Sequence, residues 1–191
     1  MKGGRKRDRY GGGAGERHDR QLPPARYNGR MQDPVTHPLS PIAQDLESTV
    51  RAAAQWLRPL PADVVSRRPA PDRWTVKEVI GHLIDSAANN HQRFVRAQFV
   101  AELVFPAYPQ NEWVACQFYN DVDWPELLEL WQRYNRHLAH VIRHVRPASL
   151  GVRCTIGSYE PATLQFLIED YVVHLKHHLD KIRERVGISR G

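Results

Sequence analysis

The stretch 74-WTVKEVIGHLIDS-86 combines a clear helix start with a histidine beside an apolar helix face. Thr75 and Glu78 match a capping box, in which each side chain bonds the backbone N–H of the other residue. Over residues 76–101, apolar residues recur every three or four positions, as on one face of an α-helix. The stretch therefore predicts a well-specified amphipathic helix with His82 at the edge of its apolar face.

Three further segments have the same periodicity, and together the four predict an all-α four-helix bundle. The first helix is expected over about residues 41–57. The third is expected to begin near Asp123, which can cap it, and to end before Pro147. The fourth is expected to have Pro161 in its first turn and to end near Gly187.

Two connections between these helices are long. Residues 58–73 are rich in proline and are expected to be irregular. Residues 102–122 lack a clean period and predict a long loop that covers part of the bundle. Its aromatic residues Tyr108, Trp113 and Tyr119 either line a pocket mouth or simply pack.

Residues 1–33 differ in composition from the rest of the chain. They hold nine Lys and Arg against four Asp and Glu, and seven of the twelve glycines, whereas residues 34–191 are nearly neutral. Such a segment cannot bury enough apolar surface to offset the entropy of ordering. We therefore expect a disordered basic tail ahead of a domain at residues 38–188. Met31 raises the hypothesis that translation starts there and that residues 1–30 are not made.

The tail leaves two interpretations open, a basic arm for nucleic acid or anionic lipid and an extension without a role, of which the second is favoured. No apolar run approaches the roughly 20 residues of a membrane span. Cys116 and Cys154 lack the spacing of a metal-binding cysteine motif, and a core of this size needs no disulfide. Composition therefore predicts a soluble cytoplasmic protein.

The fourth predicted helix carries His174 and His178, which lie one turn apart and flank its apolar arc. Imidazoles at positions i and i+4 can bind one metal ion, because their nitrogens project from neighbouring turns of the same face. A lone pair of this kind is a weak motif. Its alternative is two half-buried histidines hydrogen-bonded to neighbours.

Polar residues on the second predicted helix favour the metal interpretation. His82, Ser86, Asn89 and Arg93 form a polar line beside the apolar face, which indicates a polar pocket between helices. Periodicity places His82 at the edge of the core, but it does not show that this edge faces the fourth helix.

A rival histidine cluster lies on the third predicted helix. The cluster consists of His137, His140 and His144, which share one side of the helix with several arginines. Nearby cations disfavour the binding of another cation, so this side is interpreted as a solvated surface. His91 and His177 are interpreted as ordinary surface residues, while His18 and His37 fall in the tail and at its border.

The stretch at residues 74–86, followed by 90-NHQRF-94, resembles the second-helix signature of DinB/YfiT-like proteins. The stretch 170-DYVVHLKHHL-179 resembles their fourth helix with its HxxxH pair. The resemblance covers about residues 41–187. It implies an up-and-down-type four-helix bundle that binds a divalent metal ion, usually Zn or Ni. The metal-ligand positions implied by the resemblance are His82, His174 and His178.

Characterised relatives in the resembled family include thiol-dependent transferases and isomerases that use low-molecular-weight thiols, and many members have no assigned reaction. Three neutral imidazoles leave a coordination position open, so a metal ion there can activate a water or a thiol at neutral pH. The first hypothesis is therefore a metal-dependent transferase or hydrolase acting on a small electrophilic substrate. Arg93, which could hold an anionic group, and Asp85 and Asn89, as polar wall, are candidate supporting residues.

The second hypothesis is a non-catalytic, stress-associated metal-binding protein that works as a homodimer. Phe166 and Val173 point away from the main apolar arc of the fourth helix, which hints at a second buried contact. Nucleic-acid binding rests on the tail alone and is the weakest hypothesis.

Overall fold

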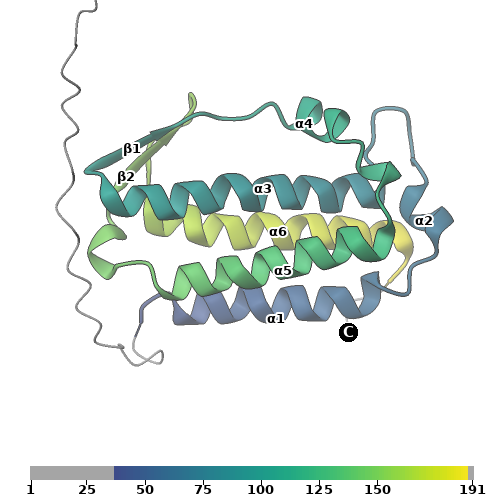
Figure 1. The fold of residues 1–191 in the computed structure, drawn as a ribbon, viewed down its shortest axis with the longest axis horizontal. Coiled ribbons are helices and arrows are strands. Elements are labelled where there is room, and N and C mark those ends of the chain that lie inside the picture. The colour runs from purple at the N-terminus through teal and green to yellow at the C-terminus, as the bar shows by residue number, and fades with distance from the viewer. Residues whose placement is uncertain (1–36, 189–191) are drawn as a thin grey trace, which may run out of the picture. The chain divides into compact units, whose positions relative to one another are not determined.

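The computed structural model describes residues 37–188, so the predictions for the basic tail and for Met31 lie outside the described residues. The predicted four-helix bundle is confirmed (Figure 1). Its long helices are α1 (Ser40–Leu57), α3 (Val76–Arg96), α5 (Trp124–Arg143) and α6 (Leu164–Val186). A short helix, α2 (Ala62–Ser66), interrupts the connection between α1 and α3.

The order of the helices in space differs from an up-and-down bundle, in which helices that follow one another in sequence are also neighbours in space. Here α1 packs against α5 and α6, and α3 packs against the same two helices. The consecutive helices α1 and α3 are therefore diagonal. In Figure 1, the neighbours α3 and α5 run in the same direction, so the chain must return along the bundle between them.

This return segment is a crossover that passes over α3 (Figure 1). A helix of about 20 residues is about 30 Å long, so the connection between two parallel neighbours must cover that distance. Sequence periodicity predicted a loop here, whereas the structure contains ordered elements. They are η1 (Ala97–Phe99), β1 (Glu102–Phe105), α4 (Gln110–Cys116) and η2 (Tyr119–Asp121). Helix α3 also ends earlier than expected, because the 3-10 turn η1 follows Arg96 directly.

The link between α5 and α6 contains the 3-10 turn η3 (Pro147–Ser149) and two strands, β2 (Arg153–Ile156) and β3 (Ala162–Thr163). Strand β1 pairs with β2 in parallel, and β2 pairs with β3 antiparallel. The small sheet therefore ties the start of the crossover to the segment that leads into α6. Pro161 was expected inside the last helix, but it precedes β3, and α6 begins at Leu164 instead.

The core lies between the four long helices and is aliphatic with a few large aromatic side chains, among them the fully buried Trp131 and Phe94. The predicted helix ends at Asp123 and Gly187 are confirmed. Asp123 Oδ2 accepts the N–H of Glu126, and Gly187 ends α6 with a φ of 71°. Among the described residues, no helix combines the length and the apolar character that crossing a membrane requires.

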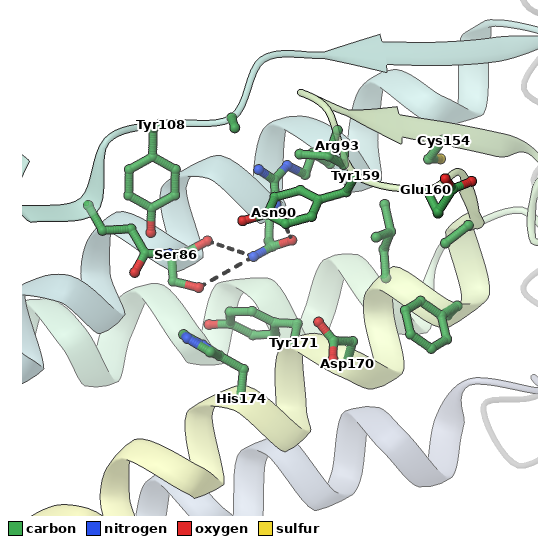
Figure 2. A pocket seen from close by; sticks show the side chains of 16 residues that line it. Ser86, Asn90, Arg93, Tyr108, Cys154, Tyr159, Glu160, Asp170, Tyr171 and His174 are labelled. Atoms are coloured by element: carbon green, nitrogen blue, oxygen red, sulfur yellow. Dashed lines mark hydrogen bonds between the residues drawn. The ribbon is translucent and has the colours of Figure 1, made fainter.

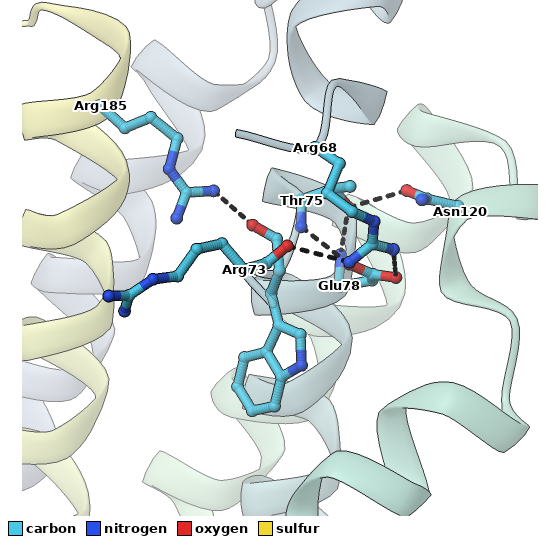
Figure 3. A network of polar contacts seen from close by, with 7 residues as sticks. Arg68, Arg73, Thr75, Glu78, Asn120 and Arg185 are labelled. Atoms are coloured by element: carbon cyan, nitrogen blue, oxygen red, sulfur yellow. Dashed lines mark hydrogen bonds and ion pairs between the residues drawn. The ribbon is translucent and has the colours of Figure 1, made fainter. Parts of the chain in front are cut away.

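The N-terminus of α3 is held by a polar network (Figure 3). Thr75 Oγ1 accepts the N–H of Glu78 at 3.1 Å, and the N–H of Thr75 donates to Glu78 Oε2 at 2.8 Å. This confirms the predicted capping box. The Thr75 hydroxyl also donates to Asn120 Oδ1 at 2.8 Å, so the same residue fastens the end of the crossover to α3.

A Thr75→Ala substitution is therefore expected to remove both the helix cap and the tether to the crossover. Loss of a helix cap costs about 1 kcal/mol, and a lost side-chain hydrogen bond adds about as much. We expect the free energy of unfolding to fall by about 1–2 kcal/mol in urea titrations. Thr75→Ser keeps the hydroxyl and should stay close to wild type. Equal stability of the alanine and serine variants would contradict this account.

Candidate metal centre

Three histidines from two helices turn their rings toward one another. His82 comes from α3, and His174 and His178 come from α6. The Nε2 atom of His174 lies 3.4 Å from that of His82 and 3.1 Å from that of His178. One nitrogen from each ring lies within 4.8 Å of the other two. Within residues 37–188, no other three His, Cys, Asp or Glu side chains converge in this way.

This spacing fits a divalent metal ion. In a tetrahedral site with bonds of 2.0–2.1 Å, neighbouring ligand nitrogens lie about 3.3–3.4 Å apart. The distances from His174 Nε2 to the other two Nε2 atoms, 3.1 and 3.4 Å, are close to that value. The arrangement can hold one ion through three neutral imidazoles and leave a further coordination position open, as in catalytic sites.

Helix packing and one aromatic contact fix the His82 ring. His82 is fully buried where α3 packs against α6. Its ring lies 4.9 Å, between centroids, from the ring of Trp74 just before the helix start. Its Nδ1 atom is buried and has no hydrogen-bond partner among the described residues. The indole of Trp74, and not the carboxylate or carbonyl that commonly orients a metal ligand, therefore holds this ring.

The surroundings keep the three imidazoles neutral. Burial, together with the neighbouring charges of His178 and His174, lowers the pKa of His82 to about 3. Burial also lowers the pKa of His178 to about 4. For His174, burial lowers the pKa while the carboxylate of Asp170 opposes that effect. Neutral rings at pH 7 present free lone pairs to a metal ion.

These lowered pKa values predict an acid-sensitive metal-free protein. An unfolded histidine has a pKa of about 6.5, so below that pH the unfolded chain binds more protons than the folded one. The free energy of unfolding with chelator present should therefore fall from pH 6.5 toward pH 5. Urea titrations at pH 7.5, 6 and 5 measure it. His177→Ala should keep the slope and a His174→Gln/His178→Gln variant should weaken it, whereas a pH-independent stability would contradict the prediction.

A pocket of about 350 Å³ adjoins His174 (Figure 2). Helix α3, helix α6, the middle of the crossover, and strands β2 and β3 with the link between them line it. Ser86, Asn90 and Arg93 face it from α3, opposite Asp170 and His174 of α6 (Figure 2). Its volume is within the range of small-molecule sites.

The three candidate supporting residues lie in two different places. Arg93 is part of the pocket wall. Asp85 is buried beneath the crossover, where its Oδ1 accepts hydrogen bonds from Gln117 and Tyr119, both at 2.7 Å. Burial raises the pKa of Asp85, and these two hydrogen bonds oppose that effect. Asn89 donates to the backbone carbonyl of Asp85 at 2.9 Å. In this structure, Asp85 and Asn89 support the helix and the crossover rather than line the pocket.

Sequence reasoning missed several residues of the pocket wall. Asn90 lies one turn after Ser86, so the polar line on the helix could have identified it. Cys154, Tyr159 and Phe166 also line the pocket. Cys154 and Tyr159 come from strand β2 and the turn after it, and no helical periodicity marks such residues in the sequence.

Of the aromatic residues of the crossover, one lines the pocket and another packs on α3. Tyr108 lines the pocket, and its ring lies 4.8 Å from that of Trp113. Burial raises the pKa of Tyr108 to about 12, so it remains a neutral hydroxyl there. Tyr119 instead packs on α3 at Gly81 and is buried.

The remaining histidines lie elsewhere. His137 and His140 on α5 and His144 just after its last residue are exposed, as expected for a solvated side. His91 is half-buried, with its ring 5.1 Å from that of His137. His37, expected at the border of the tail, is buried and donates through Nε2 to the carbonyl of Val145 at 2.7 Å. The ordered domain thus includes this histidine.

The family model of the DinB superfamily matches residues 45–182. This chain belongs to the DinB superfamily. Among solved structures it is similar to YfiT from Bacillus subtilis, described as a probable metal-dependent hydrolase with an unusual four-helix bundle topology. That match has a TM-score of 0.67 and 22% identity, and it covers 78% of this chain and 87% of YfiT. No curated protein matched the chain.

The superfamily assignment accounts for the fold of this DinB member. The matched residues run from within α1 to within α6 and include α3, α5 and the crossover between them. All three converging histidines fall inside the matched range.

Proposed function

We propose that this DinB superfamily protein is a divalent-metal-dependent enzyme, a hydrolase or a transferase, in which His82, His174 and His178 hold one ion. The observation that carries the proposal is the convergence of three neutral ring nitrogens at distances that suit one metal ion. The open pocket beside His174 provides room for a small-molecule substrate. The description of YfiT as a probable metal-dependent hydrolase supports the same class.

When bound, a zinc or nickel ion supplies a nucleophile at neutral pH by lowering the pKa of a water or a low-molecular-weight thiol. Side chains of the pocket wall would move the proton and position the substrate. Asp170 lies on the pocket wall one turn before His174, where its carboxylate can accept a proton from the nucleophile. Asn90 and Ser86 offer hydrogen bonds to the substrate from the opposite wall. We propose that the protein is cytoplasmic.

The proposal is tested by metal analysis and turnover together. Freshly purified protein should contain about one equivalent of zinc or nickel. It should act on at least one member of a panel of esters, amides and thiol-reactive electrophiles, assayed with and without low-molecular-weight thiols. His178→Ala should lose the metal and the turnover, and the exposed neighbour variant His177→Ala should keep both. Metal-free wild-type protein with unchanged turnover would refute the proposal.

The second candidate is a non-catalytic, stress-associated metal-binding homodimer. It is favoured by the exposed side chains of Phe166 and Val173, which are 54% and 63% accessible on the surface of α6. Such apolar residues, two turns apart, can form a contact between two copies of a helix. Stoichiometric metal without turnover, together with a dimer that Val173→Glu dissociates in sedimentation experiments, would favour this candidate. The nucleic-acid hypothesis concerns only the tail, outside the described residues.

A further inference from the structure

The pocket beside the metal centre contains a positive charge that is poorly balanced. Arg93 is half-buried; its Nη1 donates to Asn90 Oδ1 at 3.3 Å, and its guanidinium lies 5.5 Å from the ring centroid of Phe105. Its Nε is buried without a hydrogen-bond partner in residues 37–188. Arginine stays protonated in proteins. The guanidinium therefore has one amide and one aromatic ring around it where a carboxylate would be expected.

Other buried or partly buried cations of the bundle have close oxygen partners. Lys77 is buried and donates to the backbone carbonyls of Asn120 and Val122, at 3.0 and 2.6 Å. Lys176 pairs with Asp45 at 2.6 Å, and Arg143 pairs with Glu47. A charge removed from water without a partner is costly, so such pairing is the usual arrangement. Arg93 departs from this arrangement. No Asp or Glu of the described part of the chain forms an ion pair with it, and its one oxygen contact is the amide of Asn90 at 3.3 Å.

The position of Arg93 relates it to the metal centre. It follows His82 by eleven residues, which is close to three turns of α3, so both side chains leave the same face about 16 Å apart along the helix axis. The pocket runs from Arg93 to His174. Tyr108 and Phe166 contribute aromatic surface to its walls. A ligand in this pocket thus meets a cation from Arg93, polar and aromatic walls, and His174 of the converging histidines.

We propose that this pocket binds a small organic carboxylate, whose carboxylate group lies on the guanidinium of Arg93 and whose reactive end points toward His174. The direction of the ligand rests on the proposed function, because that function places the reaction at the histidines. A planar guanidinium suits one carboxylate through paired N–H···O bonds. Asp170 and Glu160 line the same pocket and disfavour a ligand with more negative charge.

The test compares acids with their neutral carboxamides. The probes are aryl-alkanoates from phenylacetate to 6-phenylhexanoate and the matching amides, and calorimetry on the zinc-loaded full-length protein measures their dissociation constants. At least one acid should bind about 10- to 100-fold more tightly than its amide, the range expected for charge-assisted hydrogen bonds. Arg93→Gln should abolish this preference, and Arg93→Lys should retain part of it.

Two controls identify where the carboxylate binds. Arg96→Gln removes an exposed arginine one turn away on the same helix and should leave the acid preference intact. His178→Ala removes a proposed metal ligand, so it is measured without zinc beside metal-free wild-type protein, and both should keep the acid preference. A preference that disappears in His178→Ala but survives in Arg93→Gln would place the carboxylate at the metal and overturn the inference.

The wild-type measurement stands even if a variant does not fold. If no acid in the series binds better than its amide, the inference is wrong, whatever the metal centre does. If the wild-type protein holds no metal but still prefers acids through Arg93, the proposed function fails and the anion site remains. The two failures are therefore distinguishable.

Discussion

His174→Ala is expected to weaken zinc binding by more than about 100-fold, because even loss of a group that only orients a ligand costs 10- to 100-fold. His174 is the central member of the cluster, since its Nε2 is the atom that lies close to both other rings. Without it only His82 and His178 remain, and two histidines cannot form a three-histidine site. Competition titrations with a zinc-binding dye measure the change in dissociation constant.

His177→Ala is the matched control for that experiment. His177 belongs to the same helix, is exposed, and lies outside the group of converging nitrogens. Its ring lies 5.6 Å from that of His178 but contributes no nitrogen to the converging group, so its removal should leave zinc affinity within about twofold of wild type. If both variants bind zinc equally well, the ion is held elsewhere.

Gly81→Ala is expected to destabilise the protein by about 1–3 kcal/mol, the usual cost of overpacking a tight core. A Cβ atom at Gly81 would lie 2.1 Å from the ring of Tyr119, which packs directly on α3 there. The Tyr119 hydroxyl also donates to Asp85 at 2.7 Å, so the ring cannot withdraw without losing that bond. Urea unfolding measures the effect.

The sign of the Gly81 effect should reverse when the ring is absent. Glycine in a helix interior is less favourable than alanine by about 0.5–1 kcal/mol. In a Tyr119→Ala background, Gly81→Ala should therefore stabilise the protein by about that amount. A destabilisation of the same size in both backgrounds would show that the contact with Tyr119 is not its cause.

The sequence by itself determined the four helices and their best-marked ends, and it predicted the candidate metal ligands. Local signals suffice for these features, because a capping box, a C-terminal glycine and a 3.6-residue period depend on near neighbours in the chain. The pair His174 and His178 belongs to this class, since both lie on one helix. The pairing with His82 came from a family resemblance, because periodicity could not show which neighbour its edge faced.

Only the tertiary structure decided how the helices are arranged. The diagonal placement of α1 and α3 depends on contacts between distant segments, and so does the crossover that it requires. The strand pairing between residues 102–105 and 153–156 joins segments about 50 residues apart, and no local pattern encodes it. The pocket around Arg93 exists because these segments meet. Its shape and unbalanced charge are therefore properties of the packed molecule.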